Sequence, residues 1–200
     1  MKTIFLMATG YLLGSIPTGV LLARRLRPDL DLRRIGSGNI GATNVSRALG
    51  AKWGVVTMLG DSLKGLVPVL LAQRWSGASE VVALTGLAAF LGHIYPVYLD
   101  MRGGKGVATS LGVWLGISSP LAGLALFIWA SASLIARSTT IGALSAAIAL
   151  PILALGIVTK SAGIYFMLAA VMSAMVFYTH RENIRSLISG EIKPKSSTGN

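Results

Sequence analysis

The stretch SEVVALTGLAAFLGHIYPVYL, residues 79–99, has one acidic side chain and no Lys or Arg. A helix needs about 20 mainly apolar residues to cross the ~30 Å hydrocarbon core of a bilayer. Five further segments are mainly apolar and of comparable length: residues 3–23, 53–73, 120–136, 139–158 and 162–179. Because a water-soluble domain does not repeat such segments, the sequence predicts an all-α integral membrane protein.

The composition of the chain agrees with this prediction. Of the 200 residues, 53% are hydrophobic and 12% are charged. We expect a single helical membrane domain over residues 1–200, in which the Lys-, Ser- and Gly-rich residues 188–200 form a flexible tail. The net charge is +11, and the basic residues flank apolar segments, so the expected partner is membrane lipid and not nucleic acid. Because the chain has no Cys, thiol catalysis and iron–sulfur clusters are excluded.

Residues 106–118 are apolar but short for a membrane crossing, and the distribution of Lys and Arg decides how to count them. If this segment crosses, 14 of the 18 Lys and Arg residues lie on the side of the 24–52 loop, three lie opposite and Lys64 lies within a span. If it does not, the division is ten against seven. The positive-inside rule therefore predicts seven transmembrane helices, with the amino terminus outside and the carboxyl terminus in the cytoplasm.

The longest polar segment, residues 24–52, contains a cluster of groups that suit a phosphate. Ser37 and Arg47 supply a hydroxyl and a guanidinium fork, and the glycines near them let backbone N–H groups converge on an anion. The further candidate ligands in this cluster are Gly38, Asn39, Gly41, Thr43 and Asn44. The alternative interpretation is a glycine-rich turn at the membrane surface.

A second glycine-rich motif, GGKG at residues 103–106, precedes an apolar helix. An ammonium group and unpaired N–H groups at the start of a helix favour an anion. The candidate phosphate-binding residues are Gly103, Gly104, Lys105, Gly106 and Thr109. The motif is not a Walker A loop, which would need Gly in place of Leu99 and Ser or Thr in place of Gly106. The alternative is that Lys105 only sets the membrane topology.

Charged and imidazole side chains within or at the ends of apolar segments are further candidates. Asp61 and Lys64 share a helix face and can form an ion pair; charges at membrane depth indicate a functional site, although mutual neutralisation explains them equally well. His180 and Asn183 offer hydrogen bonds to a hydroxylated substrate, and His180 also fits an ordinary position at headgroup level. His93 is interpreted as a packing or interfacial residue at least as readily as a catalytic one.

Hydroxyl groups near the start of the 139–158 segment are individually weak signals. They belong to Ser138, Thr139, Thr140 and Ser145. No acidic residue has a metal-ligand spacing with either His, so no metal site is predicted. The chain also lacks a Gly-x-Ser-x-Gly elbow, which argues against a hydrolase triad.

At these residues the chain resembles the PlsY family, bacterial acyl-phosphate:glycerol-3-phosphate acyltransferases of the inner membrane. The shared motifs run from Gly14 to Gly19, from Ser37 to Arg47, from Asp61 to Gly65, through Gly92, His93 and Pro96, from Gly103 to Thr109, and through His180, Asn183 and Arg185. They occur in order along nearly the whole chain.

This resemblance implies transfer of a fatty acyl group from acyl phosphate to the 1-hydroxyl of glycerol 3-phosphate, giving lysophosphatidic acid and phosphate. It implies no cofactor, an active site that faces the cytoplasm, and the enzyme that makes acyl phosphate as a further partner. The implied phosphate ligands are Ser37, Arg47 and Lys105, joined by Ser145, with His180 and Asn183 around the glycerol hydroxyls. Acyl phosphate has a good leaving group, so positioning the hydroxyl suffices and no acyl-enzyme is expected.

Two other classes of protein fit parts of the pattern. A transporter of organic phosphates would also place a basic pocket at the ends of apolar helices, and it would move substrate without forming an ester. A structural or lipid-sensing membrane protein would tolerate loss of Arg47 and Lys105.

Overall fold

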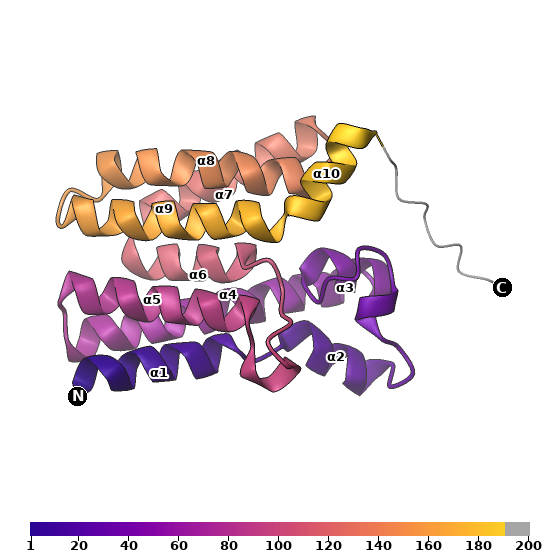
Figure 1. The fold of residues 1–200 in the computed structure, drawn as a ribbon, viewed down its shortest axis with the longest axis horizontal. Helices are drawn as coiled ribbons and strands as arrows, with labels where there is room; N and C mark the ends of the chain where they lie inside the picture. Colours follow the sequence, from indigo (N-terminus) through magenta and orange to yellow (C-terminus); the bar gives the residue numbers. More distant parts are fainter. Residues whose placement is uncertain (191–200) are drawn as a thin grey trace.

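The apolar segments form helices throughout residues 1–190, the part of the chain that the computed structural model describes (Figure 1). These residues contain no strand, as predicted. The α-helices are α1 Lys2–Gly14, α2 Thr18–Leu26, α3 Ala42–Leu49, α4 Ala51–Trp75, α5 Ser79–Ile94, α6 Val107–Ile117, α7 Ser119–Ile135, α8 Thr139–Ile157, α9 Ala162–Thr179 and α10 Arg181–Ser189. Two 3₁₀ turns, η1 Leu32–Arg34 and η2 Val97–Leu99, lie in the loops.

Five helical segments in residues 1–190 are long and apolar enough to cross a membrane. They are Lys2–Leu26, Ala51–Trp75, Ser79–Leu99, Thr139–Ile157 and Ala162–Thr179. The apolar helices α6 and α7 are shorter. They are separate because the Ser118 hydroxyl accepts a hydrogen bond from the Leu121 N–H and Pro120 follows, which is a sequence typical of a helix start. The segments predicted at 106–118 and 120–136 are thus two distinct helices.

The segment predicted as a single span over residues 3–23 is broken in the structure. α1 ends at Gly14 and α2 begins at Thr18, because Pro17 lacks an N–H and cannot continue the hydrogen bonding of α1. The break leaves the Ile16 carbonyl outside a helix, and the Lys64 Nζ of α4 donates a hydrogen bond to it at 2.7 Å. A neighbouring helix therefore satisfies the backbone group that the break frees.

The polar segments contain short helices. Within the 24–52 loop, residues 42–49 form α3, which Gly50 ends with a φ of 97°. Ile188 and Ser189, which lie within the flexible tail predicted at 188–200, belong to α10. The remainder of that prediction, residues 191–200, lies outside the described residues.

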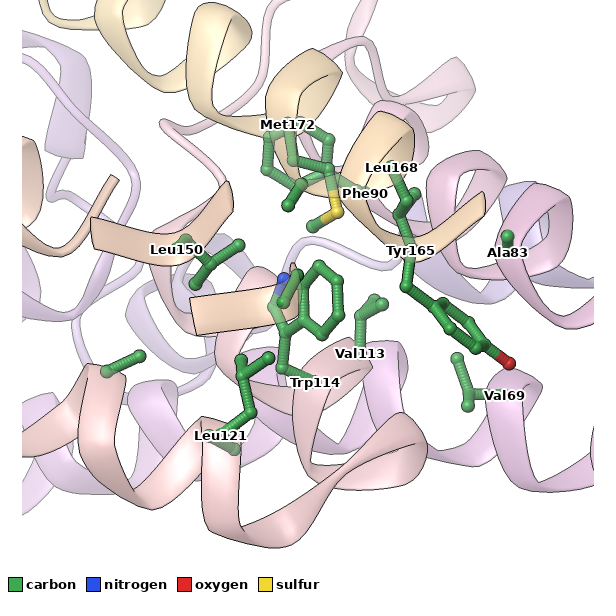
Figure 2. Packing of buried hydrophobic residues seen from close by; sticks show 14 of the residues in the cluster. Val69, Ala83, Phe90, Val113, Trp114, Leu121, Leu150, Tyr165, Leu168 and Met172 are labelled. Carbon is green, nitrogen blue, oxygen red and sulfur yellow. The ribbon is translucent and has the colours of Figure 1, made fainter. Parts of the chain in front are cut away.

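Small residues let the helices pack closely. A Cβ on Gly14 of α1 would collide with the backbone of Ala89 in α5, and one on Gly112 of α6 would collide with the backbone of Ser62 in α4. Such contacts are typical of membrane helix interfaces. Larger side chains, including Trp114 and Phe90, fill the centre of the bundle and are buried (Figure 2).

The helices form two layers with α6 between them. α7, α8 and α9 make one layer, and α1, α4 and α5 make the other (Figure 1). The short helices α2, α3 and α10 lie together at one end of the bundle, and the first residues of α1 lie at the opposite end (Figure 1). The polar motifs of the sequence are therefore gathered at one end of the molecule.

Candidate active site

A cavity of about 250 Å³ opens among the ends of α3, α6, α8 and α9. Its polar part is lined by Ser37, Asn39, Gly41, Thr43, Asn44, Arg47, Asp61, His93, Lys105, Thr139, Thr140, His180 and Asn183. Segments that are far apart in the sequence thus contribute to one wall. The remainder of the lining is mainly apolar and comes mostly from α6, α7, α8 and α9.

The loop before α3 is organised by the buried side chain of Asn44. Its Nδ2 donates to the Leu32 carbonyl at 2.8 Å, and its Oδ1 accepts a hydrogen bond from the Ser37 N–H at 3.2 Å. Gly36 has a φ of 56°, and a Cβ there would meet the Asn44 amide oxygen, so glycine is required at this turn. These contacts hold Ser37 at the cavity.

Arg47 lies one turn after Asn44 on α3 and also lines the cavity. Its guanidinium makes no hydrogen bond or ion pair with any residue in the described range 1–190. A guanidinium that lines a cavity and presents its planar fork is suited to bidentate binding of a phosphate.

The loop that carries Lys105 is fixed at both ends. The N–H groups of Gly103 and Gly104 donate to the carbonyls of Ile94 and His93, at 2.9 and 3.0 Å. On the other side, the Thr179 hydroxyl donates to the Lys105 carbonyl at 3.2 Å. The loop is thereby held between the end of α5 and the end of α9.

The ammonium group of Lys105 reaches across the cavity and donates to Oδ1 of Asn183 in α10. His180, at the junction of α9 and α10, is buried with 3% of its surface exposed. Its Nδ1 lies 2.8 Å from the Val176 carbonyl. Nδ1 is therefore the protonated nitrogen, and Nε2 is left as a hydrogen-bond acceptor.

The charge state of His180 follows from its surroundings. Burial, and secondly the positive charge of Lys105, lower the pKa of His180 to about 4. The imidazole is neutral at pH 7, so it can accept a hydrogen bond from a hydroxyl. A base with so low a pKa holds a proton poorly at that pH.

A second charged group lies deeper, in α4. Asp61 Oδ1 and Lys64 Nζ form an ion pair of 2.9 Å, with 4% and 6% of their side chains exposed. Asp61 lines the cavity, whereas Lys64 is outside the lining and donates to Ile16. His93 Nδ1 is 3.9 Å from Asp61 Oδ1, which is too long for a hydrogen bond.

Comparison with known proteins identifies the family. The family model described as glycerol-3-phosphate acyltransferase matches residues 4–190. The glycerol-3-phosphate acyltransferase of Geotalea daltonii is 50% identical over 94% of this chain and 94% of its own length. That of Geobacter sulfurreducens is 48% identical over 95% of this chain and 96% of its own length.

Solved structures agree in sequence and in fold. The crystal structure of PlsY, an integral membrane glycerol 3-phosphate acyltransferase, in its glycerol 3-phosphate form has a TM-score of 0.89 and is 41% identical, over 95% of this chain and 94% of that one. The lysophosphatidic acid form of PlsY has a TM-score of 0.87 and is 40% identical, over 95% of this chain and 93% of that one. This chain belongs to the PlsY family. It is accordingly an integral membrane protein with several spans.

The structure brings most of the site residues predicted from the PlsY motifs to one cavity. Five of the six residues that the resemblance implies as phosphate or glycerol ligands line it: Ser37, Arg47, Lys105, His180 and Asn183. Of the predicted substrate-binding residues, those in the lining are Asn39, Gly41, Thr43, Asn44, Asp61 and Gly106. Those outside the lining are Gly38, Lys64, Gly103, Gly104, Thr109 and Ser145.

Helix geometry explains why Ser145 is outside the lining and Thr140 is within it. The α8 residues in the wall include Thr140, Ala143, Ala147 and Leu150, which recur every three or four positions and so share one face of the helix. Ser145 is two residues from Ala147, which turns it about 200° away from that face.

His93 and the apolar part of the lining were not among the predicted site residues. A sequence signal for His93 existed, because Gly92 and His93 belong to the PlsY motifs quoted above. The apolar lining of α8 repeats small side chains at helical spacing, which is also the pattern of close helix packing. Sequence alone does not separate these two meanings.

Proposed function

We propose that this chain transfers an acyl group from acyl phosphate to the 1-hydroxyl of glycerol 3-phosphate, releasing phosphate and lysophosphatidic acid. The observation that carries the proposal is one continuous cavity with Arg47 and Lys105 at its polar end and apolar side chains along the rest. Such a cavity matches a phosphorylated, fatty substrate. The PlsY structures in glycerol 3-phosphate and lysophosphatidic acid forms support the acceptor and the product.

The reaction is a direct transfer. The glycerol oxygen forms a bond to the carbonyl carbon of the donor, the bond between that carbon and the phosphate oxygen breaks, and the hydroxyl proton passes to a phosphate oxygen. Arg47, Lys105 and loop N–H groups stabilise charge on the carbonyl oxygen and the departing phosphate. Holding both substrates in line contributes up to about 7 to 11 kcal/mol in ideal cases.

His180 orients the hydroxyl and does not keep its proton. With a pKa of about 4, the neutral imidazole is a weak base at pH 7. A phosphate oxygen of the donor takes the proton instead, and Nε2 of His180 serves as the hydrogen-bond acceptor that aims the hydroxyl at the donor.

Ser37 acts as a phosphate ligand and not as an acylated nucleophile. A nucleophilic serine needs a base within hydrogen-bond reach, and within residues 1–190 the Ser37 hydroxyl has no hydrogen bond to a His or Lys side chain. Isolation of an acylated Ser37 during turnover would contradict direct transfer.

We further propose seven membrane crossings in the bacterial inner membrane, with the amino terminus outside and the cavity and carboxyl terminus facing the cytoplasm. The distribution of Lys and Arg supports this orientation, and so does the position of α1's first residues opposite α3 and α10 (Figure 1). The enzyme that makes acyl phosphate is then the partner that supplies the donor.

The proposal is tested with the purified protein and labelled glycerol 3-phosphate, supplied in parallel with acyl phosphate, acyl-CoA and acyl-carrier protein. We expect labelled lysophosphatidic acid with acyl phosphate alone. Arg47→Ala should abolish it, with Arg34→Ala as the control, because Arg34 is exposed and outside the cavity. Product formation from another donor would correct the donor, and uptake into proteoliposomes without ester formation would indicate a transporter.

A further inference from the structure

The apolar part of the cavity ends at a floor of large buried side chains. Along four helices the lining stops at Trp114 in α6, Ala122 in α7, Leu150 in α8 and Met172 in α9. We call Trp114, Leu150 and Met172 the floor; they are 0%, 6% and 1% exposed. Figure 2 shows these three side chains close together within the packed core.

The structure continues beyond the floor as packed core and not as a channel. Leu121 and Leu168, next along α7 and α9, are buried and belong to the same hydrophobic cluster as the floor, and so does Ala154, one turn after Leu150 on α8. None of these three residues lines the cavity. The floor therefore closes the deep end.

The distance from the polar end to the floor can be taken from α8. Thr140 lines the polar end and Leu150 the floor, and ten residues of helix rise about 15 Å. This depth is about half of the ~30 Å hydrocarbon core of a bilayer, the thickness that one leaflet's acyl chains fill. The cavity thus has the length of a membrane acyl chain.

Many side chains in the walls above the floor are small. They include Ala122, Ala125, Ala143, Ala146 and Ala147. Space for an acyl chain exists because these side chains are small. We propose that the floor sets the longest acyl chain that the enzyme accepts, with the end of the chain resting on Leu150. This inference rests on the proposed function, in which the apolar part of the cavity holds the acyl chain of the donor.

The experiment measures chain-length profiles. Wild-type protein and each variant receive a series of saturated acyl phosphates from about ten to about twenty carbons, a range that brackets one leaflet. The readout is the ratio of kcat/KM for each long chain to that for the shortest chain. Because a ratio within one preparation cancels the fraction of folded protein, partial loss of folding does not affect it.

Leu150→Ala deepens the cavity, and we expect the longest accepted chain to increase. Each additional methylene that becomes buried should raise the relative kcat/KM about fourfold. Ala147→Leu blocks the cavity above the floor and should lower the ratio for long chains at least about tenfold. The two variants should shift the longest accepted chain in opposite directions, so the inference can still be tested if one of them does not fold.

Matched controls lie on the same helix. Leu155→Ala removes the same atoms as Leu150→Ala from an exposed position, and Ala149→Leu adds the same atoms as Ala147→Leu outside the lining. Neither should change the profile. If Leu150→Ala and Ala147→Leu leave the profile of an active enzyme unchanged, the chain leaves the cavity sideways and the inference is wrong. If wild-type protein uses no acyl phosphate of any length, the proposed function itself fails.

Discussion

Lys64 and Lys105 are two lysines near one cavity with opposite surroundings. Lys64 is buried in the middle of α4, paired with Asp61 and bonded to the Ile16 carbonyl, and it does not line the cavity. Lys105 sits on a glycine-rich loop, lines the cavity and donates to the amide of Asn183. This difference fits a structural role for Lys64 and, for Lys105, the substrate-binding role proposed above.

Replacing Lys64 should have the largest effect on stability. Lys64→Met leaves the Asp61 carboxylate buried without its cation, which costs about 3 to 5 kcal/mol. Thermal unfolding in detergent measures this loss, and Asp61→Asn/Lys64→Met should recover part of it. If the single variant unfolds like wild type, the two lysines do not differ as described.

Replacing Lys105 should affect turnover and leave stability nearly unchanged. Lys105→Ala removes a charge that stabilises the transition state, and we expect kcat to fall about 10²- to 10³-fold. Lys52→Ala is the control, because Lys52 is exposed and outside the cavity. A large fall in melting temperature with normal kcat would instead assign Lys105 a structural role like that of Lys64.

The loop that presents Lys105 can be disturbed without removing the charge. A Cβ on Gly104 would collide with the imidazole of His93, and such overpacking costs about 1 to 3 kcal/mol. Gly104→Ala should raise KM for glycerol 3-phosphate about tenfold, and Gly104→Ala/His93→Ala should recover part of it. Gly163→Ala is the control, since a Cβ there has no neighbour within 4 Å.

A further effect concerns pH. The pKa of His180 is about 4 in the folded protein, against an ordinary value of 6.5 in the unfolded chain. As the pH falls, the imidazole therefore takes up a proton in the unfolded chain before it does so in the folded protein. Stability should be complete above pH 6.5 and decline towards pH 4, by at most about 1.4 kcal/mol per pH unit. Unfolding measured at several pH values should show a weaker decline in His180→Asn.

Lys105 should also contribute to that decline. Because its charge helps to lower the pKa of His180, Lys105→Ala should reduce the pH dependence of unfolding. Lys52 is exposed and is not among the causes of this shift, so Lys52→Ala should keep the wild-type dependence. An equal change in both variants would contradict the effect of Lys105 on His180.

The sequence predicted the parts of this molecule that repeat a strong pattern. Apolar length located the helices, and glycines among polar residues located Ser37, Arg47 and Lys105, because both signals are local. The break between α1 and α2 was missed, since Pro17 occurs in an apolar segment and the contact with Lys64 that stabilises the break depends on how α4 packs. The position of His93 beside Asp61 was missed for the same reason, because it depends on how α4 and α5 pack.

The hydrogen bond between Lys64 and the Ile16 carbonyl has a consequence for the loop that follows α2. Before the loop, α4 holds the chain at Ile16 through that bond. After the loop, the chain runs through α3 directly into α4. Within this segment, Asn44 is bonded to the Leu32 carbonyl. Restricting a segment costs conformational entropy of about 1 to 2 kcal/mol per residue. Here that entropy is lost when the protein folds, so the loop is already ordered for the phosphate of the proposed substrates.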